Sequence, residues 1–146
     1  MDAIIFIGLQ ASGKSTFYRE RFFDKHVRIS LDQLRTRYRE QRILTACLET
    51  QQRFVVENTN PRIADRKKYI DVARKANYRV VGYYFRSQVS ECLARNSGRN
   101  NRVPNVAILA TAAKLELPSM AEGFDDLKYV RLGDSGFLIE DWKNEF

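Results

Sequence analysis

Short runs of apolar and β-branched residues alternate along the chain with longer segments of helical periodicity. The first run, residues 3–8, is apolar on both faces, which is typical of a central strand in a parallel sheet. Further strands are predicted at residues 27–30, 53–57 and 78–85 and, more weakly, at 127–132. Helical patterns fall between them, at residues 13–23, 32–52, 60–76, 87–97 and 105–115. This alternation predicts an α/β fold with a parallel sheet flanked by helices on both faces.

One predicted helix has a clear start signal. Asn60 is a favourable N-cap residue, and Pro61 suits the first helical position because its φ is already fixed near the helical value. The apolar residues that follow recur on one helical face: Ile63, Tyr69, Ile70 and Ala73. We therefore expect a helix that begins at Asn60 and packs on the sheet.

Length and composition indicate one globular domain spanning residues 1–146. The hydrophobic fraction is 44% and the charged fraction 29%, so the chain can bury a core without disulfides or a structural metal. Cys47 and Cys92 form no CxxC motif, and His26 is the single histidine, which disfavours a zinc site or a histidine-based triad. The apolar run at residues 3–9 is too short for a signal peptide or a membrane span. We expect a cytoplasmic protein with reduced thiols and no membrane contact.

The strongest chemical signal is Gly-Leu-Gln-Ala-Ser-Gly-Lys-Ser at residues 8–15, which fits G-x-x-x-x-G-K-[ST] between a buried strand and a helix. The backbone N–H groups of such a loop surround a phosphate, and the helix N-terminus favours negative charge. Lys14 is expected to reach the β and γ phosphates, and Ser15 to ligate Mg²⁺. The motif predicts binding of ATP or GTP by the following residues: Gly8, Gln10, Ala11, Ser12, Gly13, Lys14, Ser15 and Thr16.

The rest of the sequence indicates which class of nucleotide-binding protein carries this loop. The chain has no Asn-Lys-x-Asp motif for reading guanine, and 146 residues leave little room to couple hydrolysis to movement. A single-domain P-loop kinase is therefore favoured over a GTPase switch or a mechanical ATPase.

An acid and an arginine follow the second predicted strand. In a parallel sheet the carboxyl ends of the strands share one edge, so Asp32 and Arg35 are expected to face the phosphate loop. Asp32 would accept the proton of an attacking hydroxyl, and Arg35 would hold the acceptor or the transferring phosphate. Spacing alone supports equally a helix-capping Asp32 and a solvated Arg35.

The third predicted strand ends in Glu-Asn-Thr-Asn-Pro at residues 57–61. Glu57 is placed to help hold Mg²⁺, directly or through water. Asn58 would line an acceptor pocket or serve only to cap the next helix, and both alternatives remain open.

A polar segment at residues 95–104 separates two predicted helices. It carries Arg95 and Arg99 four residues apart and contains Gly98. Phosphoryl transfer needs cations that close over the γ-phosphate, so this segment is a candidate for a short lid. We expect Arg95 and Arg99 to contact the nucleotide and Arg102 to lie in solvent.

Positive charge is concentrated in the first three quarters of the chain. The net charge is +7, which divides into +12 for residues 1–114 and −5 for residues 115–146. Two basic runs, residues 35–42 and 62–68, are candidates for a track along a nucleic-acid backbone, although helices also carry such charges as an ordinary solvated face. The acidic segment 115–146 has no motif, and we expect Trp142 and Phe146 to pin it to the body.

Taken together, these motifs resemble the 5′-hydroxyl polynucleotide kinase family, in particular the kinase module of bifunctional polynucleotide kinase/phosphatases. The resemblance covers about residues 4–132 and rests on the loop at 8–17, Ser-x-Asp-x-x-Arg at 30–35, the motif at 57–61 and Arg-Asn-Ser-Gly-Arg at 95–99. It implies transfer of the γ-phosphate of ATP to a single-stranded or recessed 5′-hydroxyl end of DNA or RNA.

The resemblance also implies roles for the candidate residues. Asp32 would be the general base, and Arg35 would contact the phosphate of the acceptor nucleotide. Lys14, Arg95 and Arg99 would stabilise the transferring group. The chain departs from the family at two positions, since Glu57 stands where Asp is usual and Gln10 replaces a common Pro.

Two other functions remain as alternatives at this point. One is a P-loop kinase that phosphorylates a small molecule, such as a nucleoside, sugar or antibiotic hydroxyl. The other is a nucleotide-dependent regulatory module that transfers no phosphate to a separate acceptor.

Overall fold

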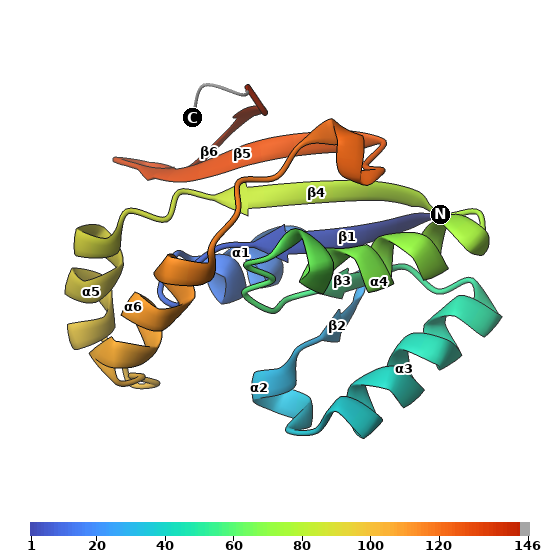
Figure 1. Ribbon diagram of the computed structural model, residues 1–146, viewed down its shortest axis with the longest axis horizontal. Coiled ribbons are helices and arrows are strands. Elements are labelled where there is room, and N and C mark those ends of the chain that lie inside the picture. The colour runs from blue at the N-terminus through green and yellow to red at the C-terminus, as the bar shows by residue number, and fades with distance from the viewer. Residues whose placement is uncertain (144–146) are drawn as a thin grey trace.

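The computed structural model describes residues 1–143, which form a six-stranded sheet with helices packed around it (Figure 1). The strands are β1 (Asp2–Ile7), β2 (Val27–Ile29), β3 (Phe54–Val56), β4 (Arg79–Phe85), β5 (Asp126–Gly133) and β6 (Gly136–Asp141). Their order across the sheet is β2-β3-β1-β4-β5-β6, and the first five in chain order run parallel. β1 lies between β3 and β4, so its carboxyl end lies at the switch point where open α/β sheets bind ligands.

The sixth strand is absent from the sequence prediction, and it makes the expected parallel sheet a mixed one. β6 runs antiparallel to β5, with Val130 opposite Ile139 and Leu132 opposite Phe137. The turn between them leads into Gly136, the first residue of β6, which has a φ of 124°, a backbone conformation that glycine adopts without strain. Part of the acidic C-terminal segment is therefore a β-hairpin along one edge of the sheet.

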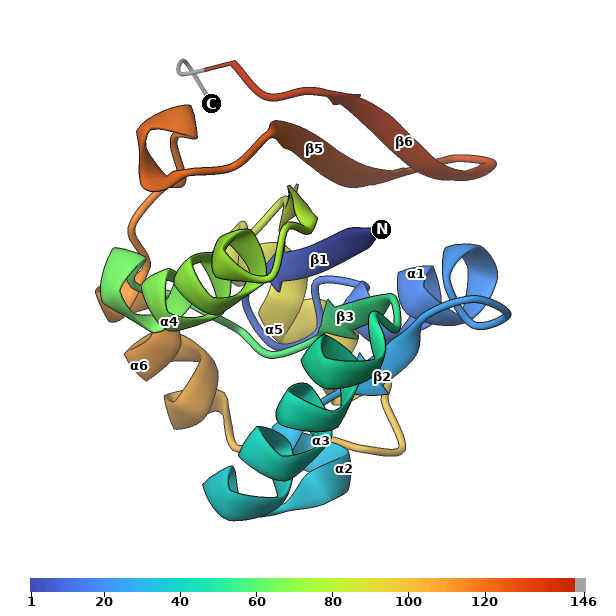
Figure 2. The same ribbon diagram turned by 90° about the vertical axis from the view of Figure 1, so that its right-hand side faces the viewer.

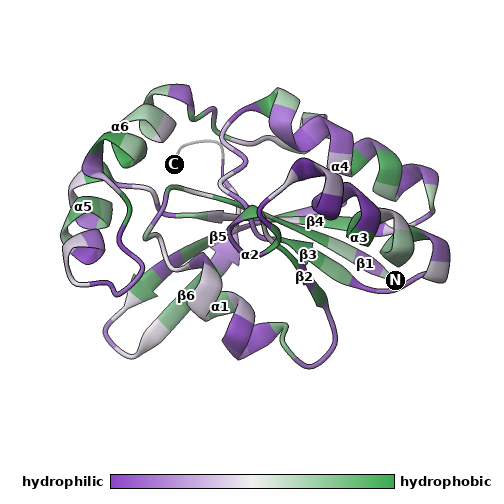
Figure 3. Cartoon of the chain, turned by 90° about the horizontal axis from the view of Figure 1, so that it is seen from below, coloured by the Kyte–Doolittle hydropathy of each residue, from purple (hydrophilic) through white to green (hydrophobic). Residues whose placement is uncertain are grey.

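The helices confirm the predicted layers. They are α1 (Lys14–Arg21), α2 (Leu31–Leu34), α3 (Arg37–Thr50), α4 (Ile63–Lys75), α5 (Val89–Ser97), α6 (Asn105–Lys114) and the 3₁₀ helix η1 (Met120–Glu122). α1 covers one face of the sheet, and α3 and α4 cover the other (Figure 3). α5 and α6 pack together beyond the carboxyl ends of β1 and β4 (Figure 1).

Each face of the sheet has its own apolar core. The α1 face is rich in aromatic rings. The ring centre of Phe17 in α1 lies 5.8 Å from that of Phe6 and 5.0 Å from that of Phe137 in the hairpin. On the opposite face Trp142 packs 5.1 Å from the ring of Tyr84, as expected for a residue that pins the C-terminal segment to the body. Phe146, expected to do the same, lies outside the described residues. Cys47 and Cys92 are free and buried, in agreement with a packing role.

The helix predicted at residues 32–52 is wrong in one respect, because the chain breaks it in two. α2 ends at Leu34, and Arg35 adopts a φ of 75°, a value that costs a non-glycine residue free energy. The side chain of Thr36 then caps α3 by accepting a hydrogen bond from the N–H of Arg39 at 3.2 Å. No glycine or proline marks this break in the sequence. Figure 2 shows α2 and α3 at the β2 end of the sheet, opposite the β5–β6 hairpin.

The predicted start of the next helix is also wrong. α4 begins at Ile63 with Arg62 as its N-cap residue, not at Asn60. Asn60 has a φ of 45°, and its buried side-chain amide donates to the carbonyl of Phe6 at 2.8 Å. It therefore fixes the loop after β3 against β1 and does not cap α4. The helix predicted at residues 87–97 also starts later than expected, because α5 begins at Val89.

Candidate functional site

The phosphate loop joins the carboxyl end of β1 to α1. Ala11 and Gly13 have φ values of 65° and 104°, and such alternation turns successive N–H groups toward one point. Gly8 is packed so closely that a Cβ there would lie 2.9 Å from Ser12 Oγ and 3.0 Å from Phe85 Cβ. Gly13 needs both its conformation and its missing side chain, because a Cβ would lie 3.0 Å from the ring of Phe137. The fold thus supplies the anion-binding loop that the motif predicts.

Lys14 lies at the centre of this loop. Its ammonium group is buried and donates to the carbonyls of Gly8 at 2.9 Å and Leu9 at 2.7 Å. Burial lowers the pKa of Lys14 from 10.5 to about 8, although the nearby carboxylate of Glu57 acts in the opposite direction. Among the smaller influences, the charge of Arg99 also lowers this pKa and that of Asp32 raises it.

The lid candidate contacts the loop from the other side. Arg95 lies in the last turn of α5 and donates to the carbonyl of Ala11 at 3.1 Å. Arg99 follows the helix, and its Nη1 is buried without a hydrogen-bond partner. The side chain of Asn96 holds the connecting segment by bonding the backbone N–H and carbonyl of Val103 at 3.1 and 2.7 Å. α5 and α6 therefore form a hairpin that brings Arg95 to the phosphate loop, with Arg99 just beyond the end of α5.

Gln10, which replaces a common proline, connects the loop to α6. Its amide donates to the hydroxyl of Thr111 at 3.0 Å, and its Oε1 is buried without a partner. Thr111 carries no sequence signal, because its contribution depends on where α6 packs. Thr16 is exposed and accepts only a long hydrogen bond, 3.4 Å, from Arg19.

Asp32 lies in the first turn of α2, which directly follows the carboxyl end of β2. Its charge raises the pKa of Lys14. Arg35 follows at the C-cap, so the two residues do not share one continuous helix as their spacing suggested. Within residues 1–143 the side chain of Arg35 is exposed and makes no hydrogen bond or ion pair, which leaves it available to an acceptor.

Asn58 belongs to a buried polar network that sequence reasoning missed. Its Oδ1 accepts from the N–H of Leu31 at 2.9 Å, and its amide donates to Glu40 Oε2 at 2.9 Å. Glu40 is buried and also accepts from the hydroxyl of Tyr69 at 2.8 Å and from Arg37 at 3.1 Å. Asn58 therefore caps α2, not α4, and ties it to α3 and α4. The only sequence signal for this network is a charged residue, Glu40, on the apolar side of a helix.

Glu57 and Ser15, the predicted metal ligands, lie near each other beside the loop. Arg28 Nη2 is 3.0 Å from Glu57 Oε2 and 3.5 Å from Ser15 Oγ, so one guanidinium bridges both. Glu57 Oε1 is buried without a hydrogen-bond partner. A carboxylate and a hydroxyl next to a phosphate loop fit Mg²⁺, which is usually held by one or two carboxylates together with nucleotide phosphates. Residues 1–143 contain no cluster of three His, Cys, Asp or Glu side chains that could hold a metal by themselves.

Several buried polar atoms around the loop have no hydrogen-bond partner within residues 1–143. They are Gln10 Oε1, Ser30 Oγ, Glu57 Oε1 and Arg99 Nη1. Buried polar groups are nearly always hydrogen-bonded, so such a group of exceptions at one place marks a surface that a polar ligand would satisfy.

The prediction that the basic run at residues 62–68 forms a surface track is wrong for one of its members. Arg66 is fully buried and forms a bidentate pair with Glu122, with nitrogen–oxygen distances of 2.8 and 3.1 Å. It also donates to the carbonyls of Asn60, Pro61 and Glu116. Arg66 is therefore a structural residue and cannot belong to a basic track on the surface.

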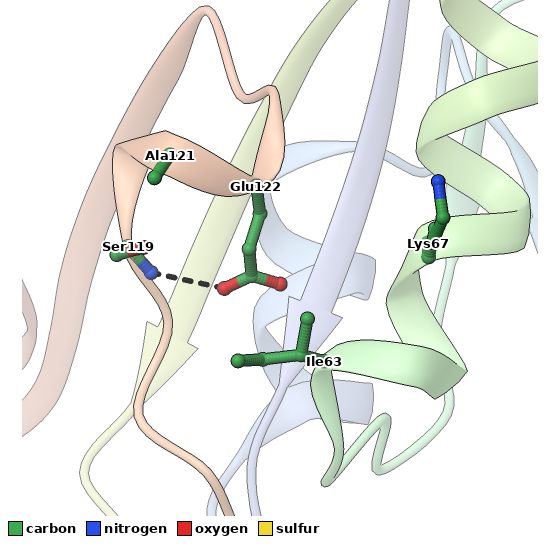
Figure 4. Close-up of a pocket in the computed structure, with 5 residues that line it drawn as sticks. All are labelled: Ile63, Lys67, Ser119, Ala121 and Glu122. Atoms are coloured by element: carbon green, nitrogen blue, oxygen red, sulfur yellow. Dashed lines mark hydrogen bonds between the residues drawn. The ribbon is translucent and has the colours of Figure 1, made fainter.

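An open cavity of about 340 Å³ lies beside this pair, between α4 and η1 (Figure 4). It is lined by Ile63, Lys67, Ser119, Ala121 and Glu122, none of which belongs to the phosphate loop. Glu122 is already bound to Arg66 and to the N–H of Ser119 at 2.9 Å. The cavity therefore offers little free polar chemistry, and the candidate site is the edge of the sheet at Lys14.

The strand order, the loop at the carboxyl end of β1 and the converging cations define a P-loop nucleotide-binding fold of the kinase type. The family model described as an AAA domain matches residues 4–118, and the chain belongs to that family. None of the helices in residues 1–143 is both long and apolar enough to cross a membrane.

Two curated relatives confirm the resemblance that the motifs indicate. The bifunctional polynucleotide phosphatase/kinase of Schizosaccharomyces pombe is 26% identical over 137 residues, which are 88% of this chain and 33% of that protein. The putative bifunctional polynucleotide phosphatase/kinase of Acanthamoeba polyphaga mimivirus is 26% identical over 157 aligned positions, covering 99% of this chain and 37% of that protein. The chain thus spans about a third of the length of these relatives.

Solved structures share the fold at lower identity. A gluconokinase from Sinorhizobium meliloti superposes with a TM-score of 0.65 at 17% identity, over 89% of this chain and 82% of that one. Kti12 from Chaetomium thermophilum, solved with ADP-AlF3, has a TM-score of 0.68 at 15% identity, over 90% of both chains. At these identities the likeness concerns the fold alone.

Proposed function

We propose that this protein is an ATP- and Mg²⁺-dependent kinase that transfers the γ-phosphate to the 5′-hydroxyl end of a polynucleotide. The observation that carries the proposal is the phosphate loop itself, in which the buried ammonium of Lys14 donates to the carbonyls of Gly8 and Leu9. Arg95 contacts the loop at Ala11, and Ser15 and Glu57 both lie within reach of one guanidinium. The charges of Asp32 and Arg99 act in opposite directions on the pKa of Lys14. A general base, a metal-binding acid and two cations are the parts that phosphoryl transfer to a hydroxyl requires. The two curated relatives support the choice of acceptor.

In this reaction Asp32 takes the proton of the 5′-hydroxyl, whose oxygen forms a bond to the γ-phosphorus. The bond from that phosphorus to the β–γ bridging oxygen breaks, and ADP leaves. Lys14 and Arg99 stabilise the negative charge on the transferring group, and Arg95 holds the loop through Ala11. Ser15 and Glu57 would hold Mg²⁺, which would supply positive charge beside the β and γ phosphates.

The acceptor enters along α2 and the start of α3. Arg35, Arg39 and Arg42 are exposed there, and the ring of Tyr38 is 71% exposed. Cations suit a phosphate backbone, and an exposed aromatic ring suits stacking with a base. Arg37 is less available, because it pairs with Glu40 at 3.1 Å.

The test is a transfer assay with γ-labelled ATP, Mg²⁺ and a 5′-hydroxyl oligonucleotide, with a free nucleoside as a competing acceptor. The expected result is label on the oligonucleotide, lost in Lys14→Met and reduced at least a hundredfold in Asp32→Asn. Transfer to the nucleoside but not to the oligonucleotide would identify a small-molecule kinase. Nucleotide binding with no transfer to either acceptor would identify a regulatory module.

Full activity in Asp32→Asn would reject the general-base role and leave the acceptor assignment intact. A fall in oligonucleotide affinity with increasing salt is also expected, since backbone binding releases counterions. A flat salt response would contradict the basic track at α2 and α3.

A further inference from the structure

Arg28 lies where the metal-binding residues meet. It is the middle residue of β2, and its side chain points to the α1 face of the sheet edge, where it contacts both Ser15 and Glu57. The distances are 3.0 Å from Nη2 to Glu57 Oε2 and 3.5 Å from Nη2 to Ser15 Oγ. The second amino group, Nη1, donates to Gln33 Oε1 of α2 at 3.2 Å.

The contact between Arg28 and Glu57 joins a partly exposed cation to a buried acid. The side chain of Arg28 is 27% exposed, whereas that of Glu57 is 3% exposed. A buried carboxylate needs a positive partner, and Arg28 supplies one at Oε2. Because the guanidinium is on the solvent side of the pair, it can leave by rotation of its own long side chain, while Glu57 stays fixed.

We propose that Arg28 gates the Mg²⁺ site by competing with the metal for Glu57 and Ser15. A guanidinium and a divalent cation at the same two oxygens repel each other at close range, so binding of one disfavours binding of the other. In the nucleotide-bound protein with metal, Arg28 would release Ser15 and Glu57 and keep its hydrogen bond to Gln33, and it would return when the metal is lost. The inference rests on the nucleotide and metal binding of the proposed function, but not on the identity of the acceptor.

This arrangement has a consequence for the protein without metal. Arg28 neutralises Glu57 in that state, so the buried acid is never left without a cation. The cost is a weaker metal site, because each binding event must first break an ion pair. The pair is partly exposed, so the cost is moderate and the exchange is reversible.

The test measures the affinity for Mn²⁺, a spectroscopic substitute for Mg²⁺, by electron paramagnetic resonance at saturating ADP. Arg28→Gln is expected to bind Mn²⁺ about tenfold more tightly than the wild type, since no charged hydrogen bond has to be broken first. Arg28→Met, which keeps the aliphatic stem, should behave in the same way. Arg53→Gln is the matched control, because Arg53 also pairs with an acid, Asp2 at 3.8 Å, but next to the amino end of β3.

An Mn²⁺ affinity that is unchanged or lower in both Arg28 variants overturns the proposal. A lower affinity would mean that Arg28 helps to hold the metal–nucleotide complex. ADP binding is measured in parallel in EDTA, where no metal is available. If ADP still binds, an unchanged Mn²⁺ affinity rejects the role of Arg28 alone and leaves the nucleotide site of the proposed function intact. If the wild type binds ADP neither with nor without Mn²⁺, the nucleotide site itself is wrong and the gate falls with it.

Discussion

The side-chain oxygen of Asn58 accepts a hydrogen bond from the backbone N–H of Leu31 at 2.9 Å, which ties the end of β3 to the start of α2. The orientation of the amide is fixed because its nitrogen donates to the buried carboxylate of Glu40 at 2.9 Å. α2 has four residues and no fully buried side chain, and its other restraints are the packing of Leu34 and the hydrogen bond from Arg28 to Gln33. The position of Asp32 therefore depends on a residue that follows a different strand.

Asn58→Asp should lower the rate of phosphoryl transfer while leaving ADP affinity unchanged. The new carboxylate would still accept from Leu31, but its second oxygen would face Glu40 and repel it. A displacement of α2 by about 1 Å is enough to cost on the order of a hundredfold in rate. Single-turnover kinetics beside ADP titration would measure both quantities. Asn77→Asp, on the turn after α4, is the control, and an equal loss of ADP binding in Asn58→Asp would contradict a positioning role.

Nucleotide affinity should depend on pH through Lys14. Its pKa is lowered from 10.5 to about 8 by burial, and only the protonated amine attracts phosphate. The affinity for nucleotide is therefore expected to be constant well below pH 8 and to fall by up to tenfold per pH unit above it. Above pH 8 the protein should take up nearly one proton for each nucleotide that binds. Calorimetry in two buffers of different ionisation enthalpy would measure that uptake. Lys14→Arg, which stays charged, should show none, and a flat wild-type profile up to pH 10 would reject the assignment.

The same pKa affects folding stability with a definite sign. Between pH 8 and 10.5 the unfolded chain binds more protons at Lys14 than the folded one, so this group makes the protein more stable as pH rises through that window. Lys14→Met removes the contribution. Urea unfolding at pH 7.5 and 9.5 should therefore show a smaller gain for the variant than for the wild type; equal gains would count against the lowered pKa.

Replacing Arg99 should lower the rate of phosphoryl transfer far more than replacing Arg102, although the two residues are close in the sequence. Arg99 has a buried amino group without a partner and acts on the charge of Lys14, whereas Arg102 is exposed. Arg99→Ala is expected to lower the transfer rate by about a hundredfold or more, as for other preorganised charge-stabilising groups. Arg102→Ala should be close to wild type in the same single-turnover assay. Similar losses in both variants would mean that the loop acts through its overall charge.

The pair between Arg66 and Glu122 should matter for stability and not for chemistry. Arg66→Met leaves the carboxylate of Glu122 buried without a cation, which is expected to cost about 3–5 kcal/mol. Replacing both residues by Met should recover part of that loss, because no charge then remains buried. Urea unfolding would measure both variants. A single variant within 1 kcal/mol of wild type would show that water or another group satisfies Glu122.

The elements with strong local signals were predictable. The buried first strand and the phosphate loop follow from residues 3–15 alone, because burial on both faces and the glycine positions are local requirements. The break at Arg35 and the start of α4 were not, since each is decided by contacts with other segments. Asn58 holds the start of the four-residue α2 from the end of β3, Thr36 caps the 14-residue α3, and Asn60 bonds to β1 instead of capping a helix.

The sequence by itself determined the kind of chemistry, because a phosphate loop, an acid after the second strand and an arginine-bearing segment each require particular residue types. The tertiary structure decided which of these side chains meet and what holds them. Arg28, Ser15 and Glu57 come from three separate elements, and only the packing of β2 beside β3 brings one guanidinium to both oxygens. Likewise Arg66 is indistinguishable from its basic neighbours in sequence, and only its burial against Glu122 removes it from the surface. Local preferences act over a few residues, whereas ion pairs across elements depend on the fold that places them.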